Sequence, residues 1–315
     1  MTQTLALETA PQDVGTPTLG ALPVRASGLY LHFDGQPAVL DGLDWTLQPG
    51  QVVGLLGRNG AGKTTLLETL LGLREPQRGK VQLFGQPALS PDDALRARLG
   101  YVPQQSDLFD EFTADQLLRY FRSFYPTWNE SKVEGLLSRW DLPRHRAIGK
   151  MSQGQQQRLS IVRALAHDPD LLVLDEPVAS LDPAGRRDFL RELVEQVLDR
   201  GTTVLFSTHI LSDLERVAFN IAFLSGGRIA LQAPQDELSE QVRLLIGDET
   251  ALKAFVDTHR GQVLRRRAPG DKTGVQTALQ SRWLVRFAGD SMPASDAQVR
   301  CETLGLEDLF VELTQ

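Results

Sequence analysis

The segment from Gly57 to Thr64 reads G-R-N-G-A-G-K-T, and these residue types at this spacing are suited to binding phosphate. Its glycines let the backbone adopt positive φ and approach a ligand closely, so that successive N–H groups can point at phosphate oxygens. Lys63 then supplies an ammonium for the β- and γ-phosphates of a nucleotide, and the Thr64 hydroxyl supplies a ligand for Mg²⁺. The expected nucleotide contacts are Gly57, Arg58, Asn59, Gly60, Ala61, Gly62, Lys63, Thr64 and Thr65.

A pair of carboxylates forms a second motif. Asp175 and Glu176 directly follow the apolar run Leu171–Leu174. A carboxylate at a strand end beside the phosphate loop is what Mg²⁺ coordination needs, and this assigns Asp175 to the metal. Glu176 is then placed to polarise an attacking water as a general base. The two motifs together predict hydrolysis of a nucleoside triphosphate.

These residues require a strand, a loop and a helix in succession, with a neighbouring strand beside them. The apolar run 51–56 before the loop predicts a buried strand, and the spacing of apolar residues in 64–71 predicts a helix after it. A helix that begins at the loop also directs its dipole and its free N–H groups at the phosphates. The runs 171–174, 202–207 and 221–224 predict further strands of a mostly parallel sheet.

Four further segments accompany the two motifs: Tyr101–Gln104, Met151–Arg158, Ser180–Pro183 and Val204–His209. In order and spacing the whole set resembles the nucleotide-binding domain of ATP-binding-cassette (ABC) ATPases, from about Val24 to Leu238. The resemblance implies an α/β fold, a P-loop NTPase cassette with a mostly parallel sheet, an antiparallel β part and a helical subdomain. It also implies ATP and Mg²⁺ as cofactors and ATP hydrolysis as the activity.

The resemblance assigns one group of residues to the ATP of an opposite subunit. Ser152, Gly154 and Gln155 match the signature motif, which in this family caps the γ-phosphate of ATP held by the other subunit. A serine and a glycine backbone at the start of the expected helix 155–166 form an anion site in physical terms. Gln153 stands where the family usually has glycine, and we expect its side chain to point outward.

Other roles also follow from the resemblance. Gln104 matches the glutamine that contacts Mg²⁺ or the attacking water, Asp182 matches the aspartate that couples the two sites, and His209 matches the histidine that contacts the γ-phosphate. Phe33 is the first candidate for the aromatic that stacks on adenine, and Tyr30 is the second. The expected catalytic residues are Glu176, His209, Lys63 and Gln104, and the expected metal ligands are Thr64, Gln104 and Asp175, the last acting through water.

The resemblance also implies partners. Two ABC ATPase subunits would sandwich two ATP molecules, and the sequence leaves open whether they form a homodimer or a heterodimer. A separate transmembrane permease subunit would receive the movement. The aromatic cluster Tyr120, Phe121, Phe124, Tyr125 and Trp128 either belongs to the core or lines the groove in which that permease docks.

Composition bounds the class of protein. The chain has 315 residues and a net charge of −7, so no nucleic-acid partner is expected. Cys301 is the single cysteine, which excludes an intrachain disulfide and favours a reducing compartment. We find no secretory signal and no apolar run of the ~18–20 residues that span a bilayer. These features favour a cytoplasmic protein, and the resemblance implies that it lies peripheral to the inner face of the cell membrane.

The chain divides into three expected regions. Residues 1–23 predict a disordered N-terminal tail. Residues 24–238 predict the ABC ATPase domain, with its helical subdomain at about 91–149. Residues 239–315 predict a small α+β accessory domain, in which Leu264–Arg267 is expected to be an exposed, charged turn.

A closer resemblance concerns the runs Phe124–Asn129, Ala166–Asp170 and Ser207–Val217. They are similar to the YtrB-like group of bacterial ABC ATPases, which implies the ATP-hydrolysing subunit of an exporter-type transporter. The alternative is a non-transport ABC ATPase that acts as a regulator or sensor. Ribosome-acting and DNA-repair forms are disfavoured because the chain has one cassette, no long coiled-coil insertion and an acidic balance.

Overall fold

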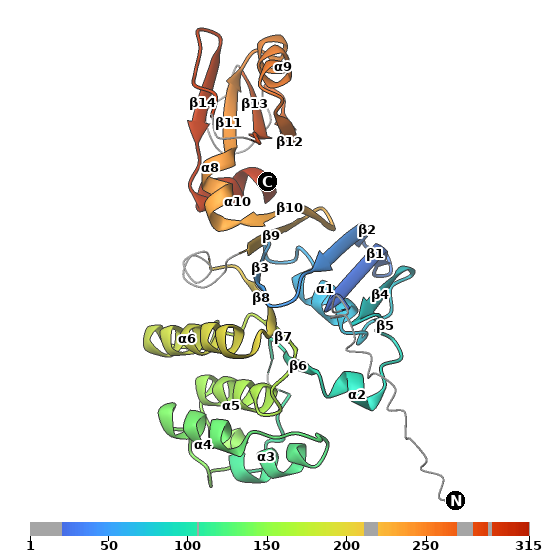
Figure 1. Ribbon diagram of the computed structural model, residues 1–315, viewed down its shortest axis with the longest axis vertical. Coiled ribbons are helices and arrows are strands. Elements are labelled where there is room, and N and C mark those ends of the chain that lie inside the picture. The colour runs from blue at the N-terminus through green and yellow to red at the C-terminus, as the bar shows by residue number, and fades with distance from the viewer. Residues whose placement is uncertain (1–20, 106, 211–219, 270–279, 289–291, 315) are drawn as a thin grey trace, which may run out of the picture.

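The computed structural model describes residues 21–105, 107–210, 220–269, 280–288 and 292–314. The expected tail 1–23 therefore falls almost wholly outside the described residues. Figure 1 shows three regions along the long axis: helices at one end, two sheets in the middle and a further sheet at the other end. Among the described residues, no helix has the length and apolar character that crossing a membrane requires.

The central sheet has six strands in the order β10-β9-β3-β8-β7-β6. Its members are β3 Val52–Leu56, β6 Leu99–Val102, β7 Leu171–Asp175, β8 Thr203–Thr208, β9 Asn220–Ser225 and β10 Arg228–Pro234. All neighbouring pairs are parallel except β9 with β10, which form a hairpin around Gly226-Gly227. Every residue of β3, β7 and β8 is buried, as expected for strands covered on both faces. Parallel strands bring the ends of β3, β7 and β8 to one edge, which gathers the predicted motifs.

A second sheet covers the face of the central sheet on which helix α1, Lys63–Leu70, the helix that follows the phosphate loop, packs. It is antiparallel, with the order β2-β1-β4-β5, and consists of β1 Val24–His32, β2 Ala38–Leu47, β4 Arg78–Leu83 and β5 Gln86–Pro87. Helix α1 buries Leu66, Leu67 and Leu70 in the core that these two sheets share. The short helix α2, Asp93–Arg96, follows β5.

The helical region is built from α3 Ala114–Arg122, α4 Glu130–Arg139 and α5 Gln153–Leu165, and α6 Pro183–Arg200 lies beside α5 in Figure 1. The expected helices 114–124 and 131–140 are thus present, with ends one or two residues away from the expectation. The range 91–149 is not wholly helical, because it contains β6, which pairs with β7 in the central sheet. Leu99–Val102 is a short alternating segment, and its partner strand decides its structure.

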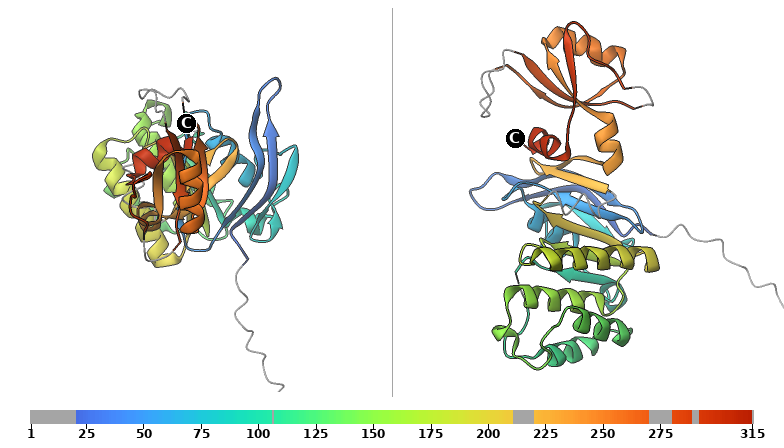
Figure 2. Two further views of the ribbon diagram at one scale, coloured as in Figure 1. Left: turned by 90° about the horizontal axis from the view of Figure 1, so that it is seen from above. Right: turned by 90° about the vertical axis from the view of Figure 1, so that its left-hand side faces the viewer.

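The C-terminal region adds a sheet of order β12-β13-β11-β14, all antiparallel. Its elements are α8 Gln235–Gln241, β11 Val242–Gly247, α9 Glu249–Thr258, β12 Gln262–Arg267, β13 Ser281–Arg286, β14 Val299–Thr303 and α10 Leu306–Thr314. Helix α9 packs against the side chains of Leu245, Trp283 and Val285. Helix α10 lies on the opposite side, between this sheet and strands β9 and β10, as Figure 1 and the right-hand view of Figure 2 both show.

The expectation of an exposed turn at Leu264–Arg267 is wrong. These residues form most of strand β12, and Arg265 and Arg267 reach the end of α10, where Arg265 Nη1 donates to the Leu313 carbonyl over 2.7 Å. A short charge run usually lies in solvent, but here the guanidinium groups of Arg265 and Arg267 pair with the end of α10.

Candidate functional site

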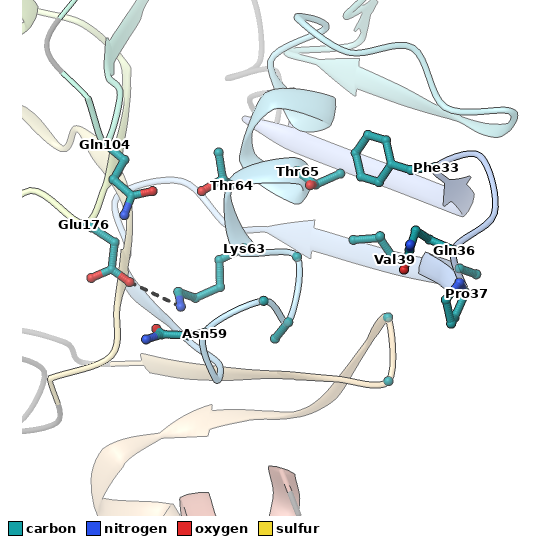
Figure 3. A pocket seen from close by; sticks show the side chains of 16 residues that line it. Phe33, Gln36, Pro37, Val39, Asn59, Lys63, Thr64, Thr65, Gln104 and Glu176 are labelled. Carbon is teal, nitrogen blue, oxygen red and sulfur yellow. Dashed lines mark ion pairs between the residues drawn. The ribbon is translucent and has the colours of Figure 1, made fainter.

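A pocket with a volume of about 720 Å³ lies at the edge where β3 ends (Figure 3). It is lined by Phe33, Gln36, Pro37, Ala38, Val39, Asn59, Gly60, Ala61, Gly62, Lys63, Thr64, Thr65, Gln104, Glu176, Gly226 and Gly227. The loop 59–65, Gln104 and Glu176 were expected at the site from the sequence, and they converge on one cavity. Phe33, the first candidate for the adenine contact, also lines it.

The loop before α1 has a backbone that favours glycine. Gly60 and Gly62 have φ of 81° and 94°, a left-handed conformation that side chains rarely adopt. A Cβ on Gly62 would also lie 2.4 Å from Val39 Cγ1. Gly62 precedes α1 and gives it no side-chain cap, so the first N–H groups of the helix are available at the pocket wall. This arrangement is suited to an anion.

Three charged or ionisable side chains meet at the inner end of the pocket. Lys63 Nζ donates to the Gly57 carbonyl over 2.9 Å and lies 3.2 Å from Glu176 Oε1. The other carboxylate oxygen of Glu176, Oε2, lies 2.8 Å from His209 Nδ1. Lys63 and Glu176 are buried, whereas the side chain of His209 is 47% exposed. The sequence assigned all three residues to catalysis, and the fold brings them into contact.

Glu176 adopts a left-handed backbone conformation with φ of 48°. For a residue other than glycine this conformation costs on the order of 1–3 kcal/mol and persists only where the surroundings fix it. Here the conformation ends strand β7 and turns the Glu176 side chain toward Lys63. The strain lies at the residue that the sequence identifies as the base.

Asp175 lies behind the pocket wall rather than in it. It is wholly buried, and its Oδ2 accepts a hydrogen bond of 2.6 Å from Thr64 Oγ1. Thr64 and Gln104 line the pocket themselves. Oxygen atoms are the donors that Mg²⁺ prefers, so this set fits the ion: Thr64 and Gln104 face the cavity, and Asp175 stands behind Thr64. The role of Asp175 as a ligand through water stays a prediction.

Phe33 is 41% exposed at the outer end of the pocket, with the Arg74 guanidinium 5.3 Å from its ring centroid. Tyr30, the second candidate, is not among the lining residues. Gln36, Pro37 and Val39 line the pocket but carry no motif, and sequence reasoning missed them. The only signal for Gln36 and Pro37 is their place in the turn between β1 and β2, and Val39 lies near the start of β2. Gly226 and Gly227, in the turn between β9 and β10, also line the pocket.

The signature residues form a separate group at the start of α5. Ser152 Oγ accepts from the Gln155 N–H over 3.2 Å, and the Ser152 N–H donates to Gln155 Oε1 over 3.0 Å, a reciprocal helix cap. Neither these two residues nor Gly154 lines the pocket of their own chain. Gln153 is exposed, as expected.

Asp182 lies beside this group. Its Oδ1 accepts from Arg158 Nη2 over 2.9 Å and from the Gly185 N–H over 3.2 Å. Arg158 belongs to α5, so Asp182 connects the start of α6 to the helix that begins at the signature. Sequence reasoning did not find this link, because it depends on two helices packing side by side.

Sequence reasoning also missed Ser207, which touches both carboxylate residues of the site. Ser207 Oγ lies 2.5 Å from Asp175 Oδ1 and 2.9 Å from the Glu176 nitrogen. The residue was read only as part of a strand that ends in His209. Nothing in its type or spacing marks it, since a serine in a buried strand is common.

Comparison with known proteins finds similar sequences and a similar solved structure. The family model described as ABC transporter matches residues 40–179. A Nod factor export ATP-binding protein I from Burkholderia pseudomallei is 40% identical over 223 residues, which cover 69% of this chain and 73% of that protein. The protein of the same name from Cupriavidus metallidurans is 36% identical over 303 residues, which cover 89% and 93%. A solved ATP-binding subunit of an ABC transporter superposes with a TM-score of 0.62 at 29% identity, covering 69% of this chain and 92% of that one.

Proposed function

The chain belongs to the ABC transporter family as an ATP-binding subunit, and from this membership we propose that it hydrolyses ATP to power a separate membrane subunit of an exporter-type transporter. The observation that carries the proposal is the contact of Lys63 and His209 with opposite oxygens of Glu176 at the inner end of the pocket. A phosphate-binding cation, a base and a polar group that orients the base meet at one point.

ATP would lie with its phosphates over the loop 57–64 and its adenine toward Phe33. The N–H groups at the start of α1 and the Lys63 ammonium would hold the phosphates. Phe33 is partly exposed and would offer adenine a stacking surface, while the Arg74 guanidinium lies 5.3 Å from the centroid of its ring. Thr64 and Gln104 would hold Mg²⁺, with Asp175 fixing the orientation of the Thr64 hydroxyl, and the ion would neutralise phosphate charge.

Glu176 would orient a water for in-line attack on the γ-phosphate and take its proton. His209 contacts Glu176 Oε2 and so limits the rotation of the carboxylate, which presents the other oxygen to the cavity. Lys63 would stabilise the negative charge that develops on the transferred phosphoryl group.

We infer that the complete site needs a second subunit. Ser152, Gly154 and Gln155 are placed at a helix start, where N–H groups attract anions, yet they lie outside the pocket of their own chain. Their expected partner is the γ-phosphate held by the opposite subunit. Two copies of this chain, or this chain and a related subunit, would therefore close over two ATP molecules.

Exposed aromatic side chains of the helical region suit contact with the membrane subunit. Tyr120 and Phe124 are 43% and 62% exposed, and both pack edge-on against neighbouring rings. Phe121 and Trp128 pack against the main core instead. We propose that Phe121 and Trp128 belong to the core and that Tyr120 and Phe124 line the groove in which the membrane subunit docks. Docking there would hold the chain at the inner face of the membrane.

We also propose that the chain consists of two domains with different roles. Residues 24–238 would form the ATPase domain and 239–315 the accessory domain, although α8 spans the junction. Strand pairing within β11–β14 is independent of the central sheet, whereas α10 packs on both.

The test is Mg²⁺-dependent phosphate release by the purified chain, compared with Glu176→Gln. The substitution keeps the size of the side chain and removes the base, so we expect turnover to fall by a factor of about 10² or more while ATP still binds. Equal turnover in both proteins would reject Glu176 as the base. Binding without turnover in the wild-type chain would favour a regulator or sensor.

A further inference from the structure

Ser207 stands at the point where the two carboxylate residues of the site meet. It lies opposite Asp175 in the register of β8 and β7, and its side chain is wholly buried. Its hydroxyl donates to Asp175 Oδ1 over 2.5 Å and accepts from the Glu176 N–H over 2.9 Å. One oxygen atom is therefore bonded to both members of the pair.

One of these bonds orients the Asp175 carboxylate, and the other holds the backbone at Glu176. The bond to Asp175 Oδ1 fixes the carboxylate so that Oδ2 faces the Thr64 hydroxyl, 2.6 Å away. The bond from the Glu176 N–H holds the peptide group just where the chain leaves β7 with positive φ. That backbone conformation is what directs the Glu176 side chain to Lys63.

We propose that Ser207 is a positioning residue for ATP hydrolysis, which sets the orientation of Asp175 and Glu176 together and thereby the Mg²⁺ requirement of the site. The inference rests on the proposed function. Mutation of a residue that hydrogen-bonds to a metal ligand commonly lowers metal affinity or activity by about 10–100-fold. Ser207 forms such a bond with Asp175, and Asp175 in turn accepts a hydrogen bond from Thr64.

A purely structural role would give a different pattern. Buried hydroxyls that bond to backbone groups occur elsewhere in the same strand: Thr203 Oγ1 accepts from the Gly50 N–H over 3.0 Å at the end of β8 remote from His209. Loss of the Thr203 hydroxyl removes one hydrogen bond and loss of the Ser207 hydroxyl removes two, so both variants should unfold at a lower temperature than the wild type. Only loss of Ser207 should alter the dependence on Mg²⁺. Thr203→Val is therefore the matched control.

The experiment compares the wild-type chain, Ser207→Ala, Ser207→Cys and Thr203→Val. Ser207→Cys keeps nearly the same volume and replaces a strong donor by a weak one, so it protects against loss of folding through a cavity. ATP affinity is measured by titration calorimetry with and without Mg²⁺, at low temperature so that hydrolysis is slow. Steady-state turnover is measured over a range of Mg²⁺ concentrations. Thermal unfolding of each variant checks the fold.

We expect both Ser207 variants to need about 10-fold or more Mg²⁺ for half-maximal turnover. Their ATP affinity should fall in the presence of Mg²⁺ and match that of the wild type in its absence. Thr203→Val should keep the wild-type Mg²⁺ dependence.

Ser207 variants that match Thr203→Val in Mg²⁺ dependence would overturn the inference and leave the ATPase proposal intact. A wild-type chain with no Mg²⁺-dependent turnover would instead count against the proposed function itself.

Discussion

At the scale of single residues, the phosphate loop is shaped by close packing as much as by its motif. Gly62 combines φ of 94° with a neighbour, Val39, that leaves no space for a Cβ. Val39 belongs to β2, in the antiparallel sheet, so the loop conformation depends on a strand distant from the motif in sequence. A side chain at this position would change both the turn and the start of α1.

Gly62→Ala should therefore abolish ATP binding and destabilise the chain by ~1–3 kcal/mol. The control is Gly135→Ala in α4, where nothing lies within 4 Å of the added Cβ and helix propensity predicts a gain of ~0.5–1 kcal/mol. Urea unfolding and ATP titration measure the two effects. Normal ATP affinity in Gly62→Ala would show that the loop tolerates a different backbone.

Most of the site residues could be predicted from the sequence because the motifs are local. Spacing alone places Lys63 and Thr64 at a helix start, since the loop and helix are continuous. Ser207 and Val39 could not be predicted in this way, because their contacts depend on which strands pair and with what register. Family resemblance supplied His209, and the structure places it against Glu176.

At the scale of elements, a buried histidine holds the loop before α4 against the end of α5. The ring of His167 stacks on Tyr125 with centroids 4.0 Å apart, and its Nε2 lies 3.0 Å from the Leu99 carbonyl. The Asn129 N–H donates to the Ala166 carbonyl over 2.7 Å. These contacts explain why the chain contains both runs, 124–129 and 166–170, because the two segments pack against each other.

This arrangement predicts a sensitivity to acid. Burial lowers the pKa of His167 from its ordinary value of 6.5 to about 4. The unfolded chain then binds more protons between these two pH values, so the stability is present above pH 6.5 and is lost as the pH falls toward 4. From pH 7 to pH 5 we expect this residue alone to cost about 2 kcal/mol.

Thermal unfolding at pH 7 and pH 5 should thus show a larger drop for the wild type than for His167→Gln, which keeps a donor for the Leu99 carbonyl but does not titrate. Parallel drops in the two proteins would mean that other groups cause the acid sensitivity.

Periodicity indicated the helices of this region but not the strand inside it. The helices 114–122 and 130–139 begin at Thr113 and Asn129, side chains that cap helix N-termini, and caps can be read from sequence. Strand β6 is four residues long, and its pairing with β7 decides its conformation. That pairing depends on the whole sheet.

At the scale of the whole molecule, α10 fastens the C-terminal sheet to the ATPase core. Leu309 and Leu313 belong to the main core cluster together with Phe223 of β9. Glu312 is buried, and it pairs with Arg282 over 2.5 Å and with Arg267 over 3.4 Å. Strand β9 continues into the Gly226-Gly227 turn of the pocket wall, so α10 packs on a strand that leads to the nucleotide site.

Glu312→Ala would leave two arginines without their buried partner, which typically costs about 3–5 kcal/mol. Glu307→Ala in the exposed first turn of the same helix should change stability by no more than ~0.5 kcal/mol. Urea unfolding at neutral pH compares them. A small and equal effect of both substitutions would show that the ion pairs do not hold α10 in place.

The role of this C-terminal region could not be predicted from the sequence, because the region has no motif of catalytic or ligand-binding residues. The arginines of β12 resemble a solvated charge run until the sheet places them against the end of α10. Four strands of the central sheet, by contrast, were predictable from their buried apolar runs: β3, β7, β8 and β9.

The central claim is that two subunits close over ATP, and the most direct measurement is the molar mass of Glu176→Gln in solution with ATP and Mg²⁺. One chain has a mass of 34.8 kDa. We predict a dimer of twice that mass with ATP, a monomer with ADP, and a monomer with ATP when Gly154→Asp is added, since a carboxylate at the signature repels the γ-phosphate. A monomer under all three conditions, despite bound ATP, would contradict the account.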